Sequence, residues 1–535
     1  MGKQRIFVFM VLFKTTNLPI VNFSPTPRHI TSSFPFTRRP QEIDYPTTLD
    51  SALNIFTLTV RHRHSVVICH QRTTNSSAMS PNNVPQRTPL SQWSAAQRKG
   101  IIIPMVMSSI LILVLVLANM SYLFGATFEQ GKRTHALKIL AVDLDGGAIG
   151  SAIVGASKSF QAANFPTIEF GSASKYSTPA AVKNAVCKGD YWGAIYINVG
   201  ASAKLASAIN GTSTAAYNAA DSVTYTYNQA RYPAIADSTI NSNIQKVVGA
   251  SRAFYYQSPN GTAALRSLNT TNLAAIAAYL NPISSTPDLI GAQTQASRVF
   301  FNTVNIIVPT LAQFFFILAL NGIGMSSGLL AKMRVRDVWL IRFTIGKIYG
   351  FLTAVTVTGY LWAFRENWAV GGPEFGKTLL VFWLYMDVQW QVLESLIGSF
   401  VPMQLIPFFF LTWMLTNVAS SVFPFEIMAG FYRIGYAFPA HEIYSLLVQA
   451  WTGCADQTRV ALPVLFSWWL VGHVGSVFSI RKRCADAAAI VAAGAAAAAA
   501  AKAPAQQDDT VSIPPRSAST EVTLQSDEEQ VRNEK

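Results

Sequence analysis

The stretch IIIPMVMSSILILVLVLANMSYLF, residues 101–124, decides the fold class of this chain. It holds no charged residue, and at about 1.5 Å per residue it can cross roughly 30 Å of hydrocarbon with some tilt. Arg98 and Lys99 stand directly before it, as is typical of the cytosolic end of a membrane span. The sequence therefore predicts a polytopic α-helical membrane protein.

Five later stretches are also apolar enough to cross a membrane, so we expect about six transmembrane helices. They cover residues 303–330, 338–364, 378–400, 401–423 and 460–480. Lys332, Arg334 and Arg336 separate the second span from the third, and a basic triplet at 481–483 follows the last. If all basic clusters are cytosolic, both termini are cytosolic and residues 125–300 form an extracytosolic domain.

Composition supports the membrane class and argues against nucleic-acid binding. Of 535 residues, 50% are hydrophobic and only 13% are charged, against about 25% charged in an average soluble domain. The net charge is +14, but residues 1–99 hold twelve Lys and Arg and only three acidic residues. The excess therefore lies on a basic tail before the first span, and its dispersed arginines make a poor nucleic-acid surface.

The ends of the chain are expected to be poorly ordered. Residues 1–100 form a cytosolic basic tail, in which 6–13 resemble a signal-peptide core. Cleavage there would place Arg98 and Lys99 outside, so we favour the alternative that 1–78 extend the gene model ahead of a start at Met79. After the last span, 485–535 contain an alanine run that could be helical and a polar remainder. We expect this segment to be a disordered cytosolic tail.

Residues 125–300 have the pattern of an α/β domain. Segments 135–154 and 189–209 each read as a strand, a turn and the start of a helix, which favours strands alternating with helices. Apolar residues at helical spacing over 238–279 predict stalk helices that lead to the second span. The candidate glycosylation sites Asn210, Asn260 and Asn269 all fall in this domain.

The segment 424–459 is aromatic, interrupted by proline, and too irregular for an ordinary span. It carries Glu426, Arg433, His441 and Glu442. A seventh crossing here would move the basic triplet 481–483 outside. We therefore expect a re-entrant or interfacial element on the outer side of the membrane.

Three segments resemble a known family. They are AVDLDGGAIG (141–150), GDYWGAIYI (189–197) and FYRIGYAFPAHEIYSLL (431–447). The first two, with the order of the spans, are similar to the ABC type-two permease superfamily. The third is similar to its fungal branch, the nitrosoguanidine-resistance proteins with a domain of unknown function. This resemblance, over about residues 100–484, implies a plasma-membrane or endomembrane protein linked to drug tolerance and lipid asymmetry.

Two enzyme motifs match by letter alone, and we expect neither to function. GGPEFGKT (371–378) fits a phosphate-binding loop but follows a membrane span and not a strand. GMSSG (324–328) fits a nucleophile elbow but ends an apolar helix. His441 and Glu442 lack the second histidine of a zinc protease motif. We expect no catalytic site, no metal and no cofactor.

Charged residues inside the spans are the strongest functional candidates. Asp387, Gln391 and Glu394 lie at i, i+4 and i+7, hence on one helix face. Lys347 in the preceding span lies at a similar depth. Because ionisable groups in hydrocarbon normally face a partner or water, these residues form either a polar transmembrane pathway or a buried pair that fixes helix packing.

Two further features concern packing. Gly346, Gly350 and Ala354 make a stripe of small residues, which favours close helix contact within the chain, with dimerisation as the alternative. Cys187 and Cys454 share the oxidising side of the expected topology, so a disulfide between them is a candidate.

The sequence favours a permease-like protein that exports or redistributes lipids or amphipathic drugs. The alternative is a scaffold that regulates lipid-translocating machinery without transporting. The expected partners are membrane lipids, a partner ATPase or lipid translocase, and a second copy of the chain; an ion gradient is the alternative energy source.

Overall fold

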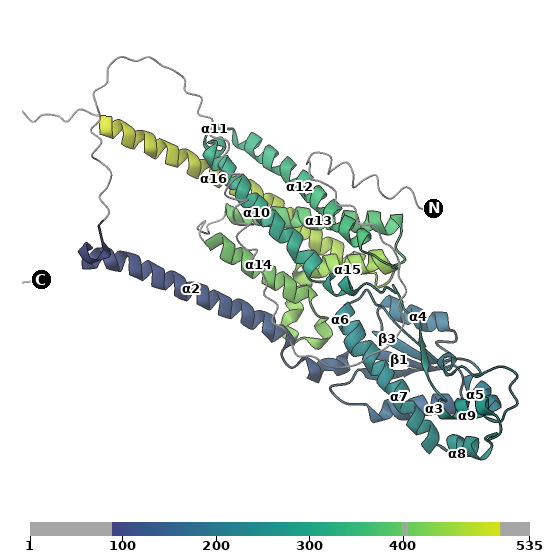
Figure 1. The fold of residues 1–535 in the computed structure, drawn as a ribbon. Helices are drawn as coiled ribbons and strands as arrows, with labels where there is room; N and C mark the ends of the chain where they lie inside the picture. Colours follow the sequence, from purple (N-terminus) through teal and green to yellow (C-terminus); the bar gives the residue numbers. More distant parts are fainter. Residues whose placement is uncertain (1–87, 399–400, 402–404, 503–535) are drawn as a thin grey trace, which may run out of the picture. The chain divides into compact units, whose positions relative to one another are not determined.

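A computed structural model describes residues 88–398, 401 and 405–502 (Figure 1). The chain divides into two compact units, Met1–Gln92 and Trp93–Lys535. In the first unit the described part is a short 3-10 helix, η1 (Leu90–Gln92); all elements below belong to the second. The predictions for 1–78 and for 503–535 fall outside the described residues.

Four helices are long and apolar enough to cross a membrane, and they make this a mostly helical membrane protein. They are α2 (Ala95–Thr127), α10 (Val304–Ser326), α12 (Val335–Ala363) and α16 (Thr458–Lys502). The 26-residue helix α13 (Gly372–Ile397) is long enough, but its four charged residues lower its hydropathy. The helix α14 (Ile406–Ser421) is apolar but shorter. The total of six crossings stays a prediction.

Helix α2 begins at a capping box in which Ser94 Oγ accepts from the Gln97 amide and Gln97 Oε1 accepts from the Ser94 amide. Its side chains are otherwise almost all exposed, as expected of a helix surrounded by lipid. One polar contact ties it to α14, where Asn119 Nδ2 donates to Thr412 Oγ1 over 3.1 Å. At its far end, the Tyr122 carbonyl accepts a hydrogen bond from Tyr432 Oη at 2.7 Å.

The α/β region predicted between the first two spans is confirmed as a five-stranded mixed sheet of order β2-β1-β3-β4-β5. The central pair, β1 and β3, is parallel and almost fully buried, in agreement with its apolar sequence. The strand β4 runs antiparallel to β3 and parallel to β5. The strands are β1 (Lys138–Asp143), β2 (Thr167–Gly171), β3 (Gly193–Ile197), β4 (Val223–Tyr227) and β5 (Ser285–Pro287).

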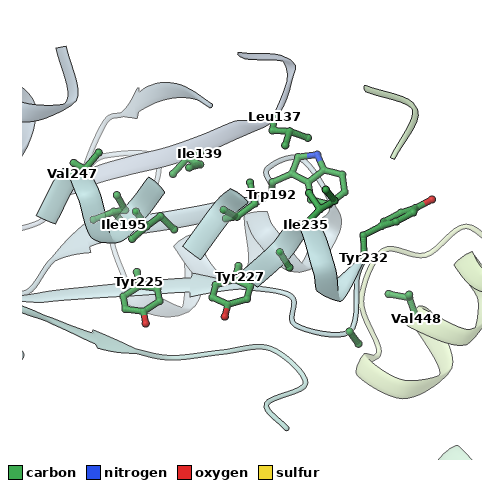
Figure 2. Packing of buried hydrophobic residues seen from close by; sticks show 14 of the residues in the cluster. Leu137, Ile139, Trp192, Ile195, Tyr225, Tyr227, Tyr232, Ile235, Val247 and Val448 are labelled. Carbon is green, nitrogen blue, oxygen red and sulfur yellow. The ribbon is translucent and has the colours of Figure 1, made fainter. Parts of the chain in front are cut away.

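Helices pack on this sheet, and one prediction about them is wrong. The segment expected to form a stalk contains α7 (Ser242–Gln257), which packs against α3 (Ala148–Ser159) and covers the sheet. Figure 2 shows Val247 of α7 in the same apolar core as Ile139 and Ile195. Helical spacing fits a stalk and a sheet-covering helix equally, so the sequence could not separate them.

The other helices of this region are α4 (Pro179–Lys188), α5 (Ala201–Ile209), α6 (Pro233–Ile235), the π-helical η4 (Ala236–Asn241), α8 (Pro259–Arg266) and α9 (Leu273–Leu280), with 3-10 turns η2 (Gln130–Ala136), η3 (Ala219–Asp221) and η5 (Ala296–Phe300).

The motif after β1 fixes a turn. Asp143 Oδ1 accepts hydrogen bonds from the amides of Asp145 and Gly146 at 3.0 and 2.9 Å. A side chain at Gly150 would overlap the Asp143 carboxylate. These contacts give the strand-turn-helix motif a structural role.

The segment after α14 is irregular and ends in a short helix. It comprises η7 (Phe425–Ile427), η8 (Gly430–Ala437) and α15 (Pro439–Thr452). The 14 residues of α15 span about 21 Å, short of the roughly 30 Å of hydrocarbon. It packs mainly against α13, α14 and α16. It also contacts the α/β domain: its Tyr444 Oη accepts from the Tyr232 amide at 2.7 Å and donates to the Ala230 carbonyl at 2.8 Å.

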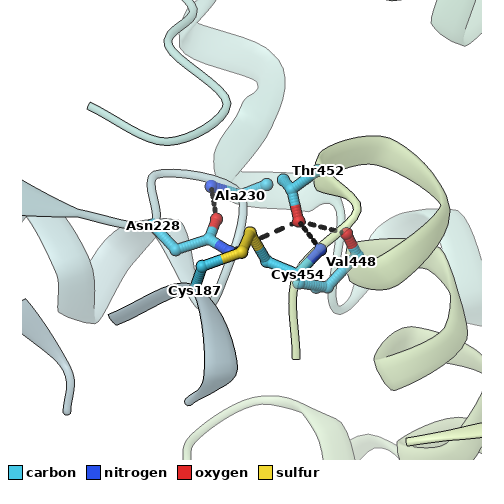
Figure 3. Close-up of a disulfide and its surroundings, with 6 residues drawn as sticks. All are labelled: Cys187, Asn228, Ala230, Val448, Thr452 and Cys454. Atoms are coloured by element: carbon cyan, nitrogen blue, oxygen red, sulfur yellow. Dashed lines mark hydrogen bonds between the residues drawn. A yellow bond between two sulfur atoms is a disulfide. The ribbon is translucent and has the colours of Figure 1, made fainter. Parts of the chain in front are cut away.

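A disulfide joins the same two parts of the chain. Cys187 in α4 bonds to Cys454, which follows α15, and their Cα atoms are 4.7 Å apart (Figure 3). Beside it, Asn228 Nδ2 donates to Thr452 Oγ1 over 3.4 Å, and Thr452 Oγ1 donates to the Val448 carbonyl at 2.7 Å. The seam between domain and segment is thus both covalent and hydrogen-bonded.

The prediction of a disordered tail from residue 485 is wrong for its first part. Helix α16 continues without a break to Lys502. Alanine has the highest intrinsic helix propensity, so the alanine run extends the helix past its basic stop. The rest of the predicted tail, 503–535, lies outside the described residues.

The small-residue stripe of α12 packs against α13. Gly346, Gly350 and Ala354 are buried, and a Cβ at Gly346 would overlap the Trp390 indole. At Gly350 the nearest atom to an added Cβ is Met386 Cβ, at an ordinary 3.5 Å. The described contacts therefore use the stripe within the chain.

We predict that Gly346→Ala destabilises the protein by about 1–3 kcal/mol, because the added methyl overpacks against Trp390. Gly350→Ala is the matched control on the same face, and it should leave stability nearly unchanged. Thermal unfolding of the purified variants in detergent measures both. Equal losses in the two variants would contradict the packing described here.

We predict that replacing both Cys187 and Cys454 by serine lowers stability by about 2–4 kcal/mol, because the disulfide closes a long loop in the unfolded chain. Non-reducing peptide mapping should recover the linked peptides from the wild type. Cys484→Ser is the control, since Cys484 is a free buried cysteine. A free thiol at Cys187 in the folded protein would refute the prediction.

Candidate functional site

Two ionic clusters sit on the face of α13 that packs against α12 and α16. One is centred on Asp387 and the other on Glu394, two helical turns apart. The structure separates these acids, which the sequence had grouped with Lys347 as either a polar transmembrane pathway or a buried pair. Lys347 pairs with Asp387 and does not contact Glu394.

The Asp387 cluster is an ion pair with an incomplete set of hydrogen bonds. Asp387 Oδ2 accepts from Lys347 Nζ and, at 2.6 Å, from Trp469 Nε1 of α16. Asp387 Oδ1 is buried and has no hydrogen-bond partner among the described residues. The Lys347 side chain retains 24% of its exposure, so the pair lies at the edge of the bundle.

Aromatic rings and a histidine surround the ammonium group. His473 Nε2 lies 3.4 Å from Lys347 Nζ, while its Nδ1 lies 2.7 Å from the Trp469 carbonyl. That carbonyl can only accept, so the contact assigns the proton to Nδ1 and leaves Nε2 as an acceptor toward Lys347. The ammonium also lies 4.8 Å from the centre of the Phe343 ring and 5.4 Å from Trp469.

A row of aromatic side chains on the facing sides of α12 and α16 leads from this cluster toward the basic ends of both helices. On α12, Phe343 stacks on Trp339 at 5.1 Å, and its edge meets His473 of α16 at 5.8 Å. Beyond them is a cavity of about 270 Å³ lined by Trp339, Arg336 and Arg481, with two valines. The row of side chains therefore links Arg336 and Arg481, at the basic end, with the Lys347–Asp387 pair.

The Glu394 cluster, by contrast, is closed. Arg342 of α12 donates to both carboxylate oxygens of Glu394, at 2.6 and 2.7 Å, and Arg483 of α16 donates at 2.7 Å. Both arginines also donate to Asn321 Oδ1 of α10. The Glu394 side chain is only 2% exposed. This arrangement clamps four helices together and leaves no room for a ligand.

Arg342 and Arg483 were missed as site residues, although the sequence held one signal. Arg342 lies four residues before Gly346, in line with the small-residue stripe, so it had to face α13. Arg483 had been assigned to the cytosolic triplet, and nothing local marks it as inward. Gln391, the third predicted residue, is buried beside Gly472 of α16 and contacts neither ion pair in the described structure.

The predicted outer residues do not form one site. Glu426 and His441 line a cavity between the α/β domain and the segment after α14, while Arg433 is exposed on η8. Glu442 is buried apart from that cavity; burial raises its pKa to about 7, and its Oε1 has no partner among the described residues. Burial lowers the pKa of His441 to about 4.

The glycosylation candidates lie on the surface of the α/β domain. Asn210 and Asn260 are exposed and Asn269 is half-buried. Their use stays a prediction.

The letter matches to enzyme motifs lack the required context. Residues 371–378 form the N-terminal turns of α13, where Glu374 Oε2 accepts from the Gly371 amide at 2.7 Å. Residues 324–328 end α10. No strand precedes either one. Within the described ranges, no group of three His, Cys, Asp or Glu side chains could hold a metal ion.

Comparison with known proteins gives one match. A family model described as "Protein of unknown function (DUF3533)" matches residues 108–474, more than half of the chain. No curated protein and no solved structure matches.

We predict that Lys347→Met destabilises the protein on the order of 3 kcal/mol, because it leaves Asp387 buried without its counter-charge. Adding Asp387→Asn should restore much of the loss, since the amide oxygen still accepts from Trp469. The matched control combines Lys347→Met with Glu394→Gln, and this double variant should be less stable than Lys347→Met alone. Thermal unfolding and the monodisperse fraction in detergent report the outcome. Rescue by Glu394→Gln would refute the pairing.

Proposed function

The chain belongs to the DUF3533 family, and we propose that it acts as a membrane permease that exports or redistributes lipids or amphipathic drugs. The observation that carries the proposal is the Lys347–Asp387 pair: the lysine side chain is 24% exposed, and one oxygen of the buried aspartate has no partner among the described residues. A pair that served only packing would be expected to have both carboxylate oxygens hydrogen-bonded, as Glu394 has.

The cavity between the basic ends of α12 and α16, and the row of side chains that leads from it to the Lys347–Asp387 pair, support this function. An amphipathic molecule has a polar end that hydrocarbon rejects and an apolar end that it accepts. The arginines that line the cavity, Arg336 and Arg481, would attract an anionic polar end. The aromatic rings and the ion pair further along would give that end polar contacts while the apolar part stayed in lipid.

The proposed topology has six crossings, in which α13 and α14 join the four apolar helices. The α/β domain then lies outside the cytosol. Two observations support that side: the disulfide, since such bonds persist in oxidising compartments, and the surface position of the three glycosylation candidates. The Arg336 and Arg481 ends of α12 and α16 meet at one cavity, as one cytosolic end requires.

The relation to nitrosoguanidine-resistance proteins and to ABC type-two permeases is part of the same proposal. It implies a role in drug tolerance and lipid asymmetry at the plasma membrane or an endomembrane. Active transport would draw on a partner ATPase or an ion gradient, and redistribution down a gradient would need neither. A second copy of the chain could cover the exposed length of α2.

The closed Glu394 cluster and the disulfide-linked α/β domain favour one alternative. A rigid scaffold that regulates a lipid translocase would need such a clamp and would need no open ion pair. The two functions differ in whether the purified protein moves lipid by itself.

The test is lipid movement in proteoliposomes that contain the purified protein and a fluorescent phospholipid, read by quenching of the outer leaflet. We predict that the wild type moves lipid and that the doubly neutral variant Lys347→Met/Asp387→Asn moves it at least about tenfold more slowly. The double variant is used because it leaves no unpaired charge, so lost movement does not simply report misfolding.

The matched control neutralises an exposed pair on α16, Lys482→Gln/Asp486→Asn, and should retain wild-type rates. Protein content and orientation must be equal in all preparations. Equal rates in wild type and in the Lys347/Asp387 variant would make the pair structural. An inactive wild type would favour the regulator.

A further inference from the structure

A second cavity, of about 250 Å³, lies where the α/β domain meets the segment after α14. The domain contributes Lys188, Arg231 and Tyr232, and the segment contributes Glu426 and Tyr436, among others. Pockets for drug-sized ligands are usually roughly 300–1,000 Å³. This cavity therefore fits a small polar group better than a whole drug.

The charges in the cavity are of both signs and are poorly satisfied within the described chain. Arg231 Nη2 lies 3.7 Å from Glu426 Oε1, beyond hydrogen-bond distance. The Arg231 guanidinium is held in place by stacking on Trp192, 4.1 Å from the ring centre. Its donors are thus oriented but free of close acceptors. His441 adds no charge near neutral pH, because burial lowers its pKa to about 4.

Tyr232 gives an independent indication of a missing ligand. Its side chain is 6% exposed and lines the cavity, yet its hydroxyl has no hydrogen-bond partner among the described residues. Figure 2 shows its ring directed away from the sheet core. The residue also has a φ of 48° before Pro233, a strained conformation of the kind often found at binding sites. Tyr444 holds it there through the Tyr232 amide.

The rim of the cavity has the character of a membrane interface. Tyr436 lines the cavity and is 48% exposed, and on the same short helix Phe431 and Ile434 are more exposed still. Tyr432 of that helix bonds to the end of α2, and the Trp468 indole of α16 donates to the Ala437 carbonyl at 2.6 Å. Aromatic side chains at the ends of spans mark the headgroup level.

We propose that this cavity binds the headgroup of a zwitterionic phospholipid. The phosphate would take the free donors of Arg231, Lys188 and the Tyr232 hydroxyl. The ammonium group would lie beside the Glu426 carboxylate and the rings of Phe425 and Tyr436, which attract cations through their faces. The acyl chains would lie along Phe431 and Ile434. This site is separate from the Lys347–Asp387 pair, and lipid binding to it does not depend on transport.

The experiment measures calorimetric binding of short-chain phosphatidylcholine and phosphatidylglycerol, below their aggregation concentrations, to the full-length protein in detergent. We expect the wild type to bind phosphatidylcholine at least about tenfold more tightly than phosphatidylglycerol. Arg231→Gln should weaken phosphatidylcholine binding about tenfold. Glu426→Gln should weaken it too, while improving phosphatidylglycerol binding, because only the ammonium needs the carboxylate. A residue that merely held the seam together would not change selectivity in this way.

Arg433→Gln is the matched control, since Arg433 is an exposed cation of the same segment that does not line the cavity. Equal weakening by Arg433→Gln, or equal affinity of the wild type for both lipids, would overturn the proposal. Soluble glycerophosphocholine separates the two sources of the headgroup: binding as tight as that of the lipid would overturn the membrane assignment.

A second measurement covers variants that fail to fold. A photoactivatable phosphatidylcholine, incubated with wild-type protein, should label peptides that contain Tyr436 and should be displaced by excess unlabelled phosphatidylcholine but not by phosphatidylglycerol. Labelling confined to the other spans would refute the site. Loss of labelling at Tyr436 in a folded Arg231→Gln variant would support it.

Discussion

The helix bundle depends on one buried carboxylate. Glu394 accepts hydrogen bonds from Arg342 and Arg483, and both arginines share Asn321, so helices α10, α12, α13 and α16 meet at one polar cluster. Removing charges from water is expensive, and a buried cluster is tolerated only when its members are fully bonded to one another. In hydrocarbon this condition also fixes geometry, because each arginine has few places where its donors can be satisfied. The clamp sets the register of the helices that hold the Lys347–Asp387 pair.

The two ionic clusters on α13 differ in how far they are buried and hydrogen-bonded. The Glu394 cluster joins four helices, whereas the Lys347–Asp387 pair has a partly exposed ammonium group and a buried carboxylate oxygen without a partner among the described residues. Glycines allow the close helix contacts around both clusters. The Trp390 indole packs against Gly346 and Gln391 packs against Gly472, and a Cβ at either glycine would overlap these side chains. Close backbone approach brings charged side chains from neighbouring helices within bonding distance.

A similar contrast exists on the other side of the bundle. The Cys187–Cys454 disulfide and Tyr444 lock the α/β domain to the segment after α14. Next to this closed seam is a cavity where Arg231 and Glu426 form a loose ion pair and the Tyr232 hydroxyl has no partner among the described residues.

The sequence by itself determined the membrane class, the α/β character of the region between the first two spans and the residues worth inspecting, because the length of an apolar stretch and the alternation of strand and helix patterns are local properties. It also placed Asp387 and Glu394 on one helix face, since that follows from 3.6 residues per turn. Only the tertiary structure decided which cation each acid meets, that α7 covers the sheet, and that Arg231 and Glu426 share a cavity. Those outcomes depend on contacts between residues far apart in the chain, such as Arg342 with Glu394 and Tyr232 with Tyr444, and no local pattern encodes which side chain lies opposite another.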